Sequence, residues 1–121
     1  MSAQITITIK EDMAIIKVVG RAGLQDILDA NEQLTHEGKY IYPRRFWDLR
    51  ECLLDLSAAE VETIANSSDQ YEQSSSKVAI LATNDLTFGL SRMFQVFRQS
   101  KYINMAVFRD EGKAIRWLLS D

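Results

Sequence analysis

The serine in the stretch LLDLSAAEVE (residues 53–62) has the setting that most directly suggests a chemical role. A serine hydroxyl can accept a phosphoryl group, which adds about −1.5 to −2 charges at neutral pH. Ser57 also stands three residues before Glu60, the spacing of a helix capping box, and Leu56 and Val61 are spaced as a hydrophobic staple around it. The sequence therefore predicts that a helix begins at Ser57. A plain helix cap is the preferred interpretation of the hydroxyl, and a phosphoacceptor is the alternative.

A second group of polar residues is expected where the strands of a parallel sheet end. Ligands of open α/β sheets tend to bind beyond the carboxyl ends of the strands, so these side chains could hold a nucleotide or another anion. They could equally be helix caps and turn formers. The residues concerned are Asp48, Arg50, Asp55, Ser57, Thr83, Asn84, Asp85, Arg109 and Asp110.

The stretch TFGLSRMFQVFR (residues 87–98) suggests a contact surface on a helix. If the apolar residues at helical spacing form the core-facing stripe, Phe88 and Arg92 remain together on another face, four residues apart. An aromatic ring beside an arginine suits a protein or dimer interface. It also suits plain packing, with the arginine stem lying over the ring. The expected core stripe is Leu86, Leu90, Met93 and Phe97, widened by Phe94.

The usual catalytic arrangements are missing from the sequence. Ser91 follows Gly89 by two residues, but Met93 stands where a nucleophile elbow needs glycine. The chain has neither a phosphate-binding loop nor a dinucleotide-binding glycine cluster. One histidine and one cysteine are too few for the usual zinc sites. We therefore expect a protein that is not an enzyme and that needs no cofactor or metal.

The number and distribution of charged residues indicate which kinds of molecule the protein could bind. The net charge is −3, which argues against nucleic acid as the main partner. Residues 1–85 hold 8 Lys/Arg against 14 Asp/Glu, and residues 86–121 hold 6 against 3, so the net charges of the two parts are −6 and +3. This asymmetry fits solvated helix faces or a polarised surface that orients a protein partner. The start of the chain does not look like a secretory signal, and no segment approaches the roughly 20 apolar residues of a membrane span. We expect a cytoplasmic protein.

The elements that must position these residues follow from hydrophobic spacing. Ile5, Ile7 and Ile9 alternate with polar residues, and a second strand-like run, AIIKVVG, follows after three residues, which predicts an antiparallel hairpin. A helix follows, with Gly38 as its terminator and His36 in its last turn. Pro43 places the start of the next strand near Arg45 or Phe46 and its end by Leu49.

The second half alternates regularly. It reads as a helix from Ser57 to about Gln73, a strand at residues 78–82, a helix from Asp85 to about Gln99, a strand at residues 104–108 and a last helix capped by Asp110. The order is β-β-α-β-α-β-α-β-α in one domain, residues 1–121. Strands alternating with helices predict an α/β fold with a mostly parallel five-stranded sheet and an antiparallel N-terminal edge strand.

This order, together with RRFWDLRE, DLSAAEV, FGLSRMF and VFRDEGKAIRWL, resembles the STAS fold, which is named for sulphate transporters and anti-sigma factor antagonists such as SpoIIAA. The chain resembles more closely the small bacterial SpoIIAA-like proteins that are grouped with the CRAL-TRIO lipid-binding proteins. In the antagonists, an Asp-Ser-Ser-Gly or Asp-Ser-Thr-Gly stretch at the start of the second helix carries the phosphorylated hydroxyl. The resemblance places Asp55 on the acidic position and Ser57 on the acceptor, with Leu56 and Ala58 departing from the pattern. Arg50 would then offset the repulsion of a phosphate by neighbouring acids.

The resemblance implies a regulatory module that binds a protein partner through the start of the second helix and the face of the third. A homodimer is a further option. The alternative, from the CRAL-TRIO side, is an apolar cavity that holds a lipid or similar ligand. Its expected lining is Met93, Phe94, Phe97 and Trp117.

Overall fold

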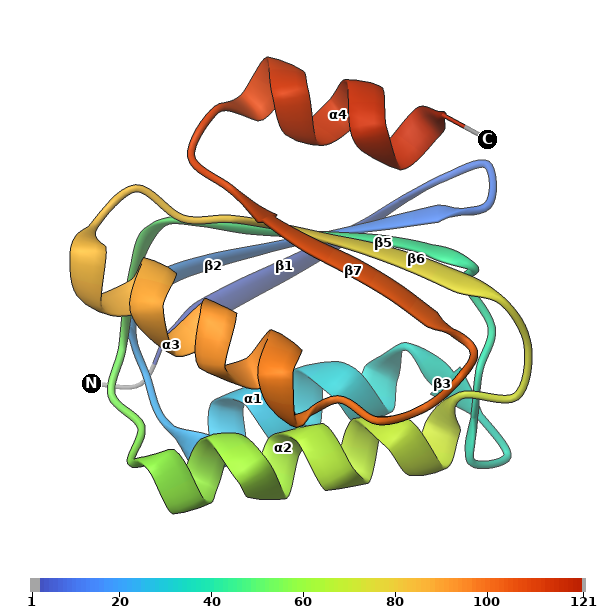
Figure 1. The fold of residues 1–121 in the computed structure, drawn as a ribbon, viewed down its shortest axis with the longest axis horizontal. Helices are drawn as coiled ribbons and strands as arrows, with labels where there is room; N and C mark the ends of the chain where they lie inside the picture. The colour runs from blue at the N-terminus through green and yellow to red at the C-terminus, as the bar shows by residue number, and fades with distance from the viewer. Residues whose placement is uncertain (1–2, 121) are drawn as a thin grey trace.

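The computed structural model describes residues 3–120. It contains a five-stranded sheet, a small two-stranded hairpin and four helices (Figure 1). In chain order the elements are β1 (Gln4–Lys10), β2 (Met13–Ala22), α1 (Leu24–Gln33), β3 (Thr35–His36), β4 (Lys39–Tyr40), β5 (Arg44–Leu54), α2 (Ala58–Tyr71), β6 (Ser76–Leu81), α3 (Asp85–Phe97), β7 (Ile103–Phe108) and α4 (Glu111–Leu119).

The main sheet has the strand order β1-β2-β5-β6-β7. β1 pairs antiparallel with β2, and every other neighbouring pair is parallel. The predicted α/β class, the mostly parallel sheet and the antiparallel N-terminal edge strand are therefore confirmed. Parallel neighbours need crossover helices, which is why β5, β6 and β7 are each separated by a helix along the chain.

The helices cover the two faces of the sheet unequally. Figure 1 shows α1, α2 and α3 on one face and α4 alone on the other. The larger apolar core lies under the three helices and contains the inward side chains of β2 and β5, such as Ile16, Val18 and Trp47. The smaller core lies under α4 and joins Phe46 and Leu81 to Ala114 and Leu118.

The strand after Pro43 is longer than the sequence suggested. β5 runs to Leu54, where the prediction ended it at Leu49. A register shift against β2 lies between Lys17 and Val19, and beyond it Cys52 and Leu54 again point inward, while Leu53 is exposed. A β-bulge of this kind lets a strand continue after one residue has dropped out of register.

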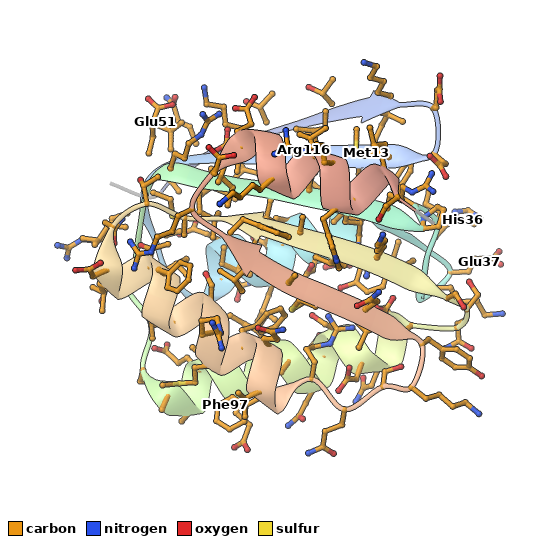
Figure 2. The ribbon with its side chains drawn as sticks, turned by 45° about the horizontal axis from the view of Figure 1, so that its top comes forward. Met13, His36, Glu37, Glu51, Phe97 and Arg116 are labelled. Carbon is orange, nitrogen blue, oxygen red and sulfur yellow. The ribbon has the colours of Figure 1, made fainter. Side chains whose placement is uncertain are left out.

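The expected position of His36 was wrong. α1 ends at Gln33, and His36 lies in β3, where it pairs with Lys39 of β4. The turn between them has positive φ at Glu37 (53°) and Gly38 (75°). A two-residue hairpin turn of this type needs positive φ at both central positions, so Gly38 serves the hairpin rather than the end of a helix. Figure 2 shows His36 and Glu37 near the border of the molecule.

A buried ion-pair network joins β5 to the ends of α2 and α3. Arg45 is 1% exposed and donates from Nη2 to both carboxylate oxygens of Glu72, at 3.0 and 2.9 Å. Arg98 reaches the same carboxylate at 2.8 Å and Asp69 at 2.7 Å. The Tyr40 ring lies 3.8 Å from the Arg45 guanidinium carbon. Since two arginines meet two carboxylates, the charges balance where little water can screen them.

Candidate functional site

Ser57 is the exposed cap of α2. Its Oγ accepts the backbone N–H of Glu60 at 3.2 Å, and the Glu60 carboxylate accepts the backbone N–H of Ser57 at 2.9 Å. Both halves of the predicted capping box are therefore present. Leu56 and Val61 line the same apolar pocket on the inner side of α2, as expected of a hydrophobic staple. The local sequence folds in this way because the cap satisfies the first-turn N–H groups while the staple anchors the incoming chain.

Hydrogen bonds join the start of α3 to the end of β5. Asn84 caps α3 by accepting the Thr87 backbone N–H at 2.8 Å, and its Nδ2 donates to the Cys52 carbonyl at 3.1 Å. The buried Thr87 hydroxyl donates to the same carbonyl at 3.1 Å and accepts the Leu54 backbone N–H at 3.3 Å. Because Leu54 leads directly into the cap of α2, these bonds place the starts of α2 and α3 at the same end of the sheet (Figure 1).

Asp48 and Arg50 do not lie at a strand end, because β5 continues beyond them. Arg50 donates to both carboxylate oxygens of Asp48, at 3.0 and 2.9 Å, and also pairs with Glu111 at the start of α4 at 2.7 Å. These bonds hold the pKa of Asp48 below its ordinary value and raise the pKa of Arg50. The pair ties α4 to the sheet and is not available to balance a charge on Ser57, contrary to the role considered for Arg50.

Of the remaining acids of the expected strand-end site, Asp110 caps α4 by accepting the Lys113 backbone N–H at 2.9 Å, and the other two pair with arginines. Asp55 lies 3.5 Å from Arg21 of β2, and both side chains are exposed. Asp85 lies 3.0 Å from Arg109, which also donates to the Thr83 carbonyl at 2.9 Å. Arg21 was not among the residues predicted for this site, and only the parallel pairing of β2 with β5 brings it near Asp55. The structure thus divides the expected strand-end cluster into separate pairs instead of forming one pocket.

The predicted core stripe of α3 was right only in part, since Leu90 and Phe94 pack against the larger core but are half-buried. The two fully buried residues of this helix are Thr87 and Ser91, while Leu86 is 55% exposed. The Ser91 hydroxyl donates to the Thr87 carbonyl at 2.8 Å, so both buried hydroxyls have partners. Small side chains with satisfied hydroxyls let the helix approach the sheet closely, and the larger apolar residues are left nearer the surface. The hydroxyl residues at positions 87 and 91, four apart and directly after Asn84, were the signal in the sequence.

Phe88 and Arg92 do not form the pair that their spacing suggested. Phe88 is half-buried and packs against the larger core. The cation over its ring is Arg109, whose guanidinium carbon lies 4.1 Å from the ring centroid. Arg92 is exposed. Of the two interpretations, plain packing fits Phe88, with a different arginine above it.

The residues at these two helix starts lie at the same end of the sheet, and we call them together the helix-start surface. It combines acidic, hydroxyl, amide and apolar side chains over the first turns of α2 and α3. Its exposed members are Asp55, Ser57, Ala58, Asn84, Asp85 and Leu86, and the half-buried Leu56 lies among them.

An apolar pocket lies between the sheet and the three helices that cover this face. It encloses about 60 Å³ and is lined by side chains that include Trp47, Ile64 and Phe94. Of the expected lining only Phe94 contributes, because Met93 and Phe97 lie elsewhere on α3 and Trp117 belongs to α4 on the opposite face. Pockets that hold drug-sized ligands usually enclose about 300–1,000 Å³. A lipid would therefore need the helices to move apart.

The chemistry of the remaining side chains is limited. Burial raises the pKa of the Cys52 thiol to about 11, so little reactive thiolate is present at neutral pH. Among residues 3–120, no group of three or more His, Cys, Asp or Glu side chains is placed to hold a metal ion. Within the same residues, no helix is long and apolar enough to cross a membrane.

No protein-family model and no curated protein sequence matches this chain. Solved structures do resemble it. An uncharacterized protein of the DUF3478 family from Shewanella loihica, described as having a SpoIIAA-like fold, matches with a TM-score of 0.59 and 20% identity, over 97% of this chain and 94% of that one. An anti-sigma factor antagonist from Mycobacterium paratuberculosis matches with a TM-score of 0.63 and 12% identity, over 98% and 96% of the two chains.

The Bacillus cell fate determinant SpoIIAA in its phosphorylated form matches with a TM-score of 0.50 and 11% identity, over 96% of this chain and 98% of that one. At such identities the likeness concerns the backbone and not the site residues. Together with the strand order and the placement of the four helices, it shows that this chain has the SpoIIAA-like (STAS) fold.

Proposed function

We propose that this chain is a non-enzymatic regulatory module that binds a protein partner through the helix-start surface. The observation that carries the proposal is the hydrogen-bonded connection between the two helix starts. Asn84 and Thr87 fasten α3 to the last residues of β5, which lead directly to Ser57. A rigid surface that combines an exposed Leu86 with polar groups suits recognition by a folded partner, because little conformational entropy is lost on binding.

The fold supports the same proposal. Two of the similar structures are described as an anti-sigma factor antagonist and as SpoIIAA in a phosphorylated form. Regulators of this kind act by contact with other proteins, and we extend that mode of action to this chain. A cytoplasmic location belongs to the same proposal.

Ser57 is the proposed phosphoacceptor. Its side chain is exposed, and a phosphate on Oγ would lie at the positive end of the α2 dipole. Asp55 and Glu60 would repel the phosphate, whereas Arg21, which is held close by Asp55, would attract it. The modification would also strain the bond that Oγ accepts from the Glu60 N–H, so the first turn of α2 would rearrange. This change in charge and shape would weaken binding of a partner selected by the unmodified surface.

The lipid-binding alternative finds weaker support. A pocket of about 60 Å³ is far smaller than the roughly 300–1,000 Å³ of usual ligand pockets, so the alternative needs an opening of the core. Extraction of the purified protein followed by mass spectrometry separates the two proposals, because a carrier yields a stoichiometric lipid and an interaction module does not.

Photo-crosslinking tests the proposed surface directly. A photoreactive amino acid in place of Leu86 should capture a defined protein from lysate of the source cells. The same group in place of Ile41, which is 51% exposed and lies before β5 at the other end of the sheet, is the control. Equal capture at both positions, or none at position 86, contradicts the proposal.

Two substitutions of Ser57, by asparagine and by aspartate, test whether a negative charge at this position weakens partner binding. Asparagine and aspartate both cap helices as well as serine does, so they differ mainly in charge. With the captured partner in hand, Ser57→Asn should bind it within about twofold of the parent protein, and Ser57→Asp should bind at least tenfold more weakly, which corresponds to about 1.4 kcal/mol. Equal affinities for the two variants would overturn the switch while leaving the interaction surface intact.

A further inference from the structure

The free edge of β1 is the feature that the proposed function does not use. β1 lies at one end of the strand order and pairs with β2 over all seven of its residues. In Figure 2 the blue β1–β2 hairpin forms one border of the sheet, with no other ribbon beyond it. Alternate residues of such an edge strand direct their backbone N–H and C=O groups outward, where another strand can pair with them.

The two edges of the sheet differ. At the opposite edge, the Gln95 side chain of α3 donates to the Met105 carbonyl of β7 at 2.8 Å and so covers part of that strand. In the part of the chain that the structure describes, no side chain bonds to the backbone of β1. Lys10 at the end of β1 is the only charged residue of this strand, and residues 4–9 contain neither proline nor charge. The pairing of β1 with β2 has no bulge, so the middle of this edge lacks the usual protective features.

The sequence of β1 is complementary to itself when two copies run antiparallel around Ile7. Ile5 of one copy then faces Ile9 of the other, and Thr6 faces Thr8. Isoleucine and threonine pairs of this kind are favourable across antiparallel strands. Gln4 faces Lys10, so no like charges meet. Ile9 is 44% exposed in the single chain, and the pairing would cover it.

We propose that two copies of this chain associate through their β1 strands, around a two-fold axis at Ile7, and join their sheets into one continuous sheet. A second copy is favoured over an unrelated peptide because antiparallel pairing around Ile7 places isoleucine opposite isoleucine and threonine opposite threonine over residues 5–9. The helix-start surface lies at the strand ends and over α2 and α3, so the dimer leaves it open. The proposal is therefore independent of the proposed function.

Pairs of like or opposite charges, introduced at positions 6 and 8, test the proposed antiparallel register around Ile7. In Thr6→Glu/Thr8→Glu the new glutamates face each other across the interface, twice by symmetry. In Thr6→Glu/Thr8→Lys each new glutamate faces a new lysine. Positions 6 and 8 are exposed, and position 6 lies opposite Lys17 of β2, so a glutamate there also suits the single chain. Asn66→Glu/Gln70→Glu, on the exposed face of α2, adds the same two charges away from the edge and is the control.

Sedimentation velocity over a concentration series, with circular dichroism to confirm folding, measures the outcome. The parent protein should approach twice its mass of 13.8 kDa. We expect Thr6→Glu/Thr8→Glu to raise the dimer dissociation constant at least tenfold, and Thr6→Glu/Thr8→Lys and the α2 control to stay within about threefold of the parent. A parent protein that stays at 13.8 kDa at every concentration overturns the proposal, as does a dimer or larger assembly that the paired glutamates leave unchanged.

Hydrogen exchange of the parent protein provides a second measurement that needs no variant. The outward-facing amides of β1 should exchange at least tenfold more slowly at concentrations above the dissociation constant than below it. The amides of β7 should not change. Equal exchange of β1 at both concentrations would also overturn the proposal.

Discussion

Arg45 and Glu72 form a buried ion pair in which Arg45 donates hydrogen bonds to both carboxylate oxygens of Glu72, and their side chains are 2% and 0% exposed. The two residues are 27 positions apart in the sequence, and the pair joins the start of β5 to the residue that ends α2. Arg98 closes the network from the end of α3. The far ends of the helices that carry the helix-start surface are thereby fastened to the sheet.

Removal of the Glu72 charge should destabilise the protein strongly. Glu72→Gln leaves Arg45 and Arg98 buried without their shared carboxylate, and breaking one side of a buried pair costs about 3–5 kcal/mol. Urea unfolding measures the loss. Glu51→Gln is the control, because the Lys17–Glu51 pair is 51% and 61% exposed and should be worth less than about 1 kcal/mol. A similar small loss in both variants would show that the network contributes little.

The cap of α2 should contribute measurably to stability. Ser57→Ala removes the acceptor of the Glu60 N–H and should lower the free energy of unfolding by about 1 kcal/mol. Ser57→Asn supplies another acceptor and should stay within a few tenths of a kcal/mol of the parent. Equal losses in these two variants, measured by urea unfolding, would argue against the capping role.

The Thr87 hydroxyl should matter more than its methyl group. Thr87→Val keeps the volume but leaves the Leu54 N–H without its acceptor and takes one of two donors from the Cys52 carbonyl, which should cost about 1–3 kcal/mol. Thr87→Ser retains the hydroxyl and should lose less. If serine proves more damaging than valine, packing rather than hydrogen bonding holds α3 to β5.

Cys52 should react slowly with alkylating reagents and should lower stability at alkaline pH. With a pKa of about 11 the folded thiol is about 1% ionised at pH 9, whereas an ordinary thiol of pKa 9.0 is half ionised. Iodoacetamide should therefore modify the folded protein far more slowly than the urea-unfolded protein at this pH.

The direction of the stability change follows from the raised pKa. The stabilisation due to the neutral buried thiol is fully present below pH 9.0 and is lost as the pH rises through about 11, because the unfolded chain releases its proton first. The fall in unfolding free energy between these values should be smaller in Cys52→Ala. Parallel pH profiles of the two proteins would contradict the assignment to this residue.

The sequence by itself determined the elements whose signals are local. Alternation over residues 5–9, the short link to the next run and the capping box at Ser57 and Glu60 each depend on neighbours within a few residues, and the structure contains all three. The order of strands and helices then favoured mostly parallel pairing, because parallel neighbours need a connection as long as a helix, whereas antiparallel neighbours are commonly joined by a short hairpin.

Tertiary structure decided what depended on contacts between distant segments. The bulge opposite Lys17 and Val19 extended β5 past Leu49 and removed Asp48 and Arg50 from the strand end. Because α3 lies close to β5, the buried residues of α3 are Thr87 and Ser91 and not Leu86. Burial of a hydroxyl costs little free energy when a nearby carbonyl or N–H forms a hydrogen bond with it. The partners of Arg45, Arg21 and Arg109 could not be predicted from the sequence either. A long cationic side chain can reach many acids, and only the fold brings one within 2.9, 3.5 and 3.0 Å of these three arginines.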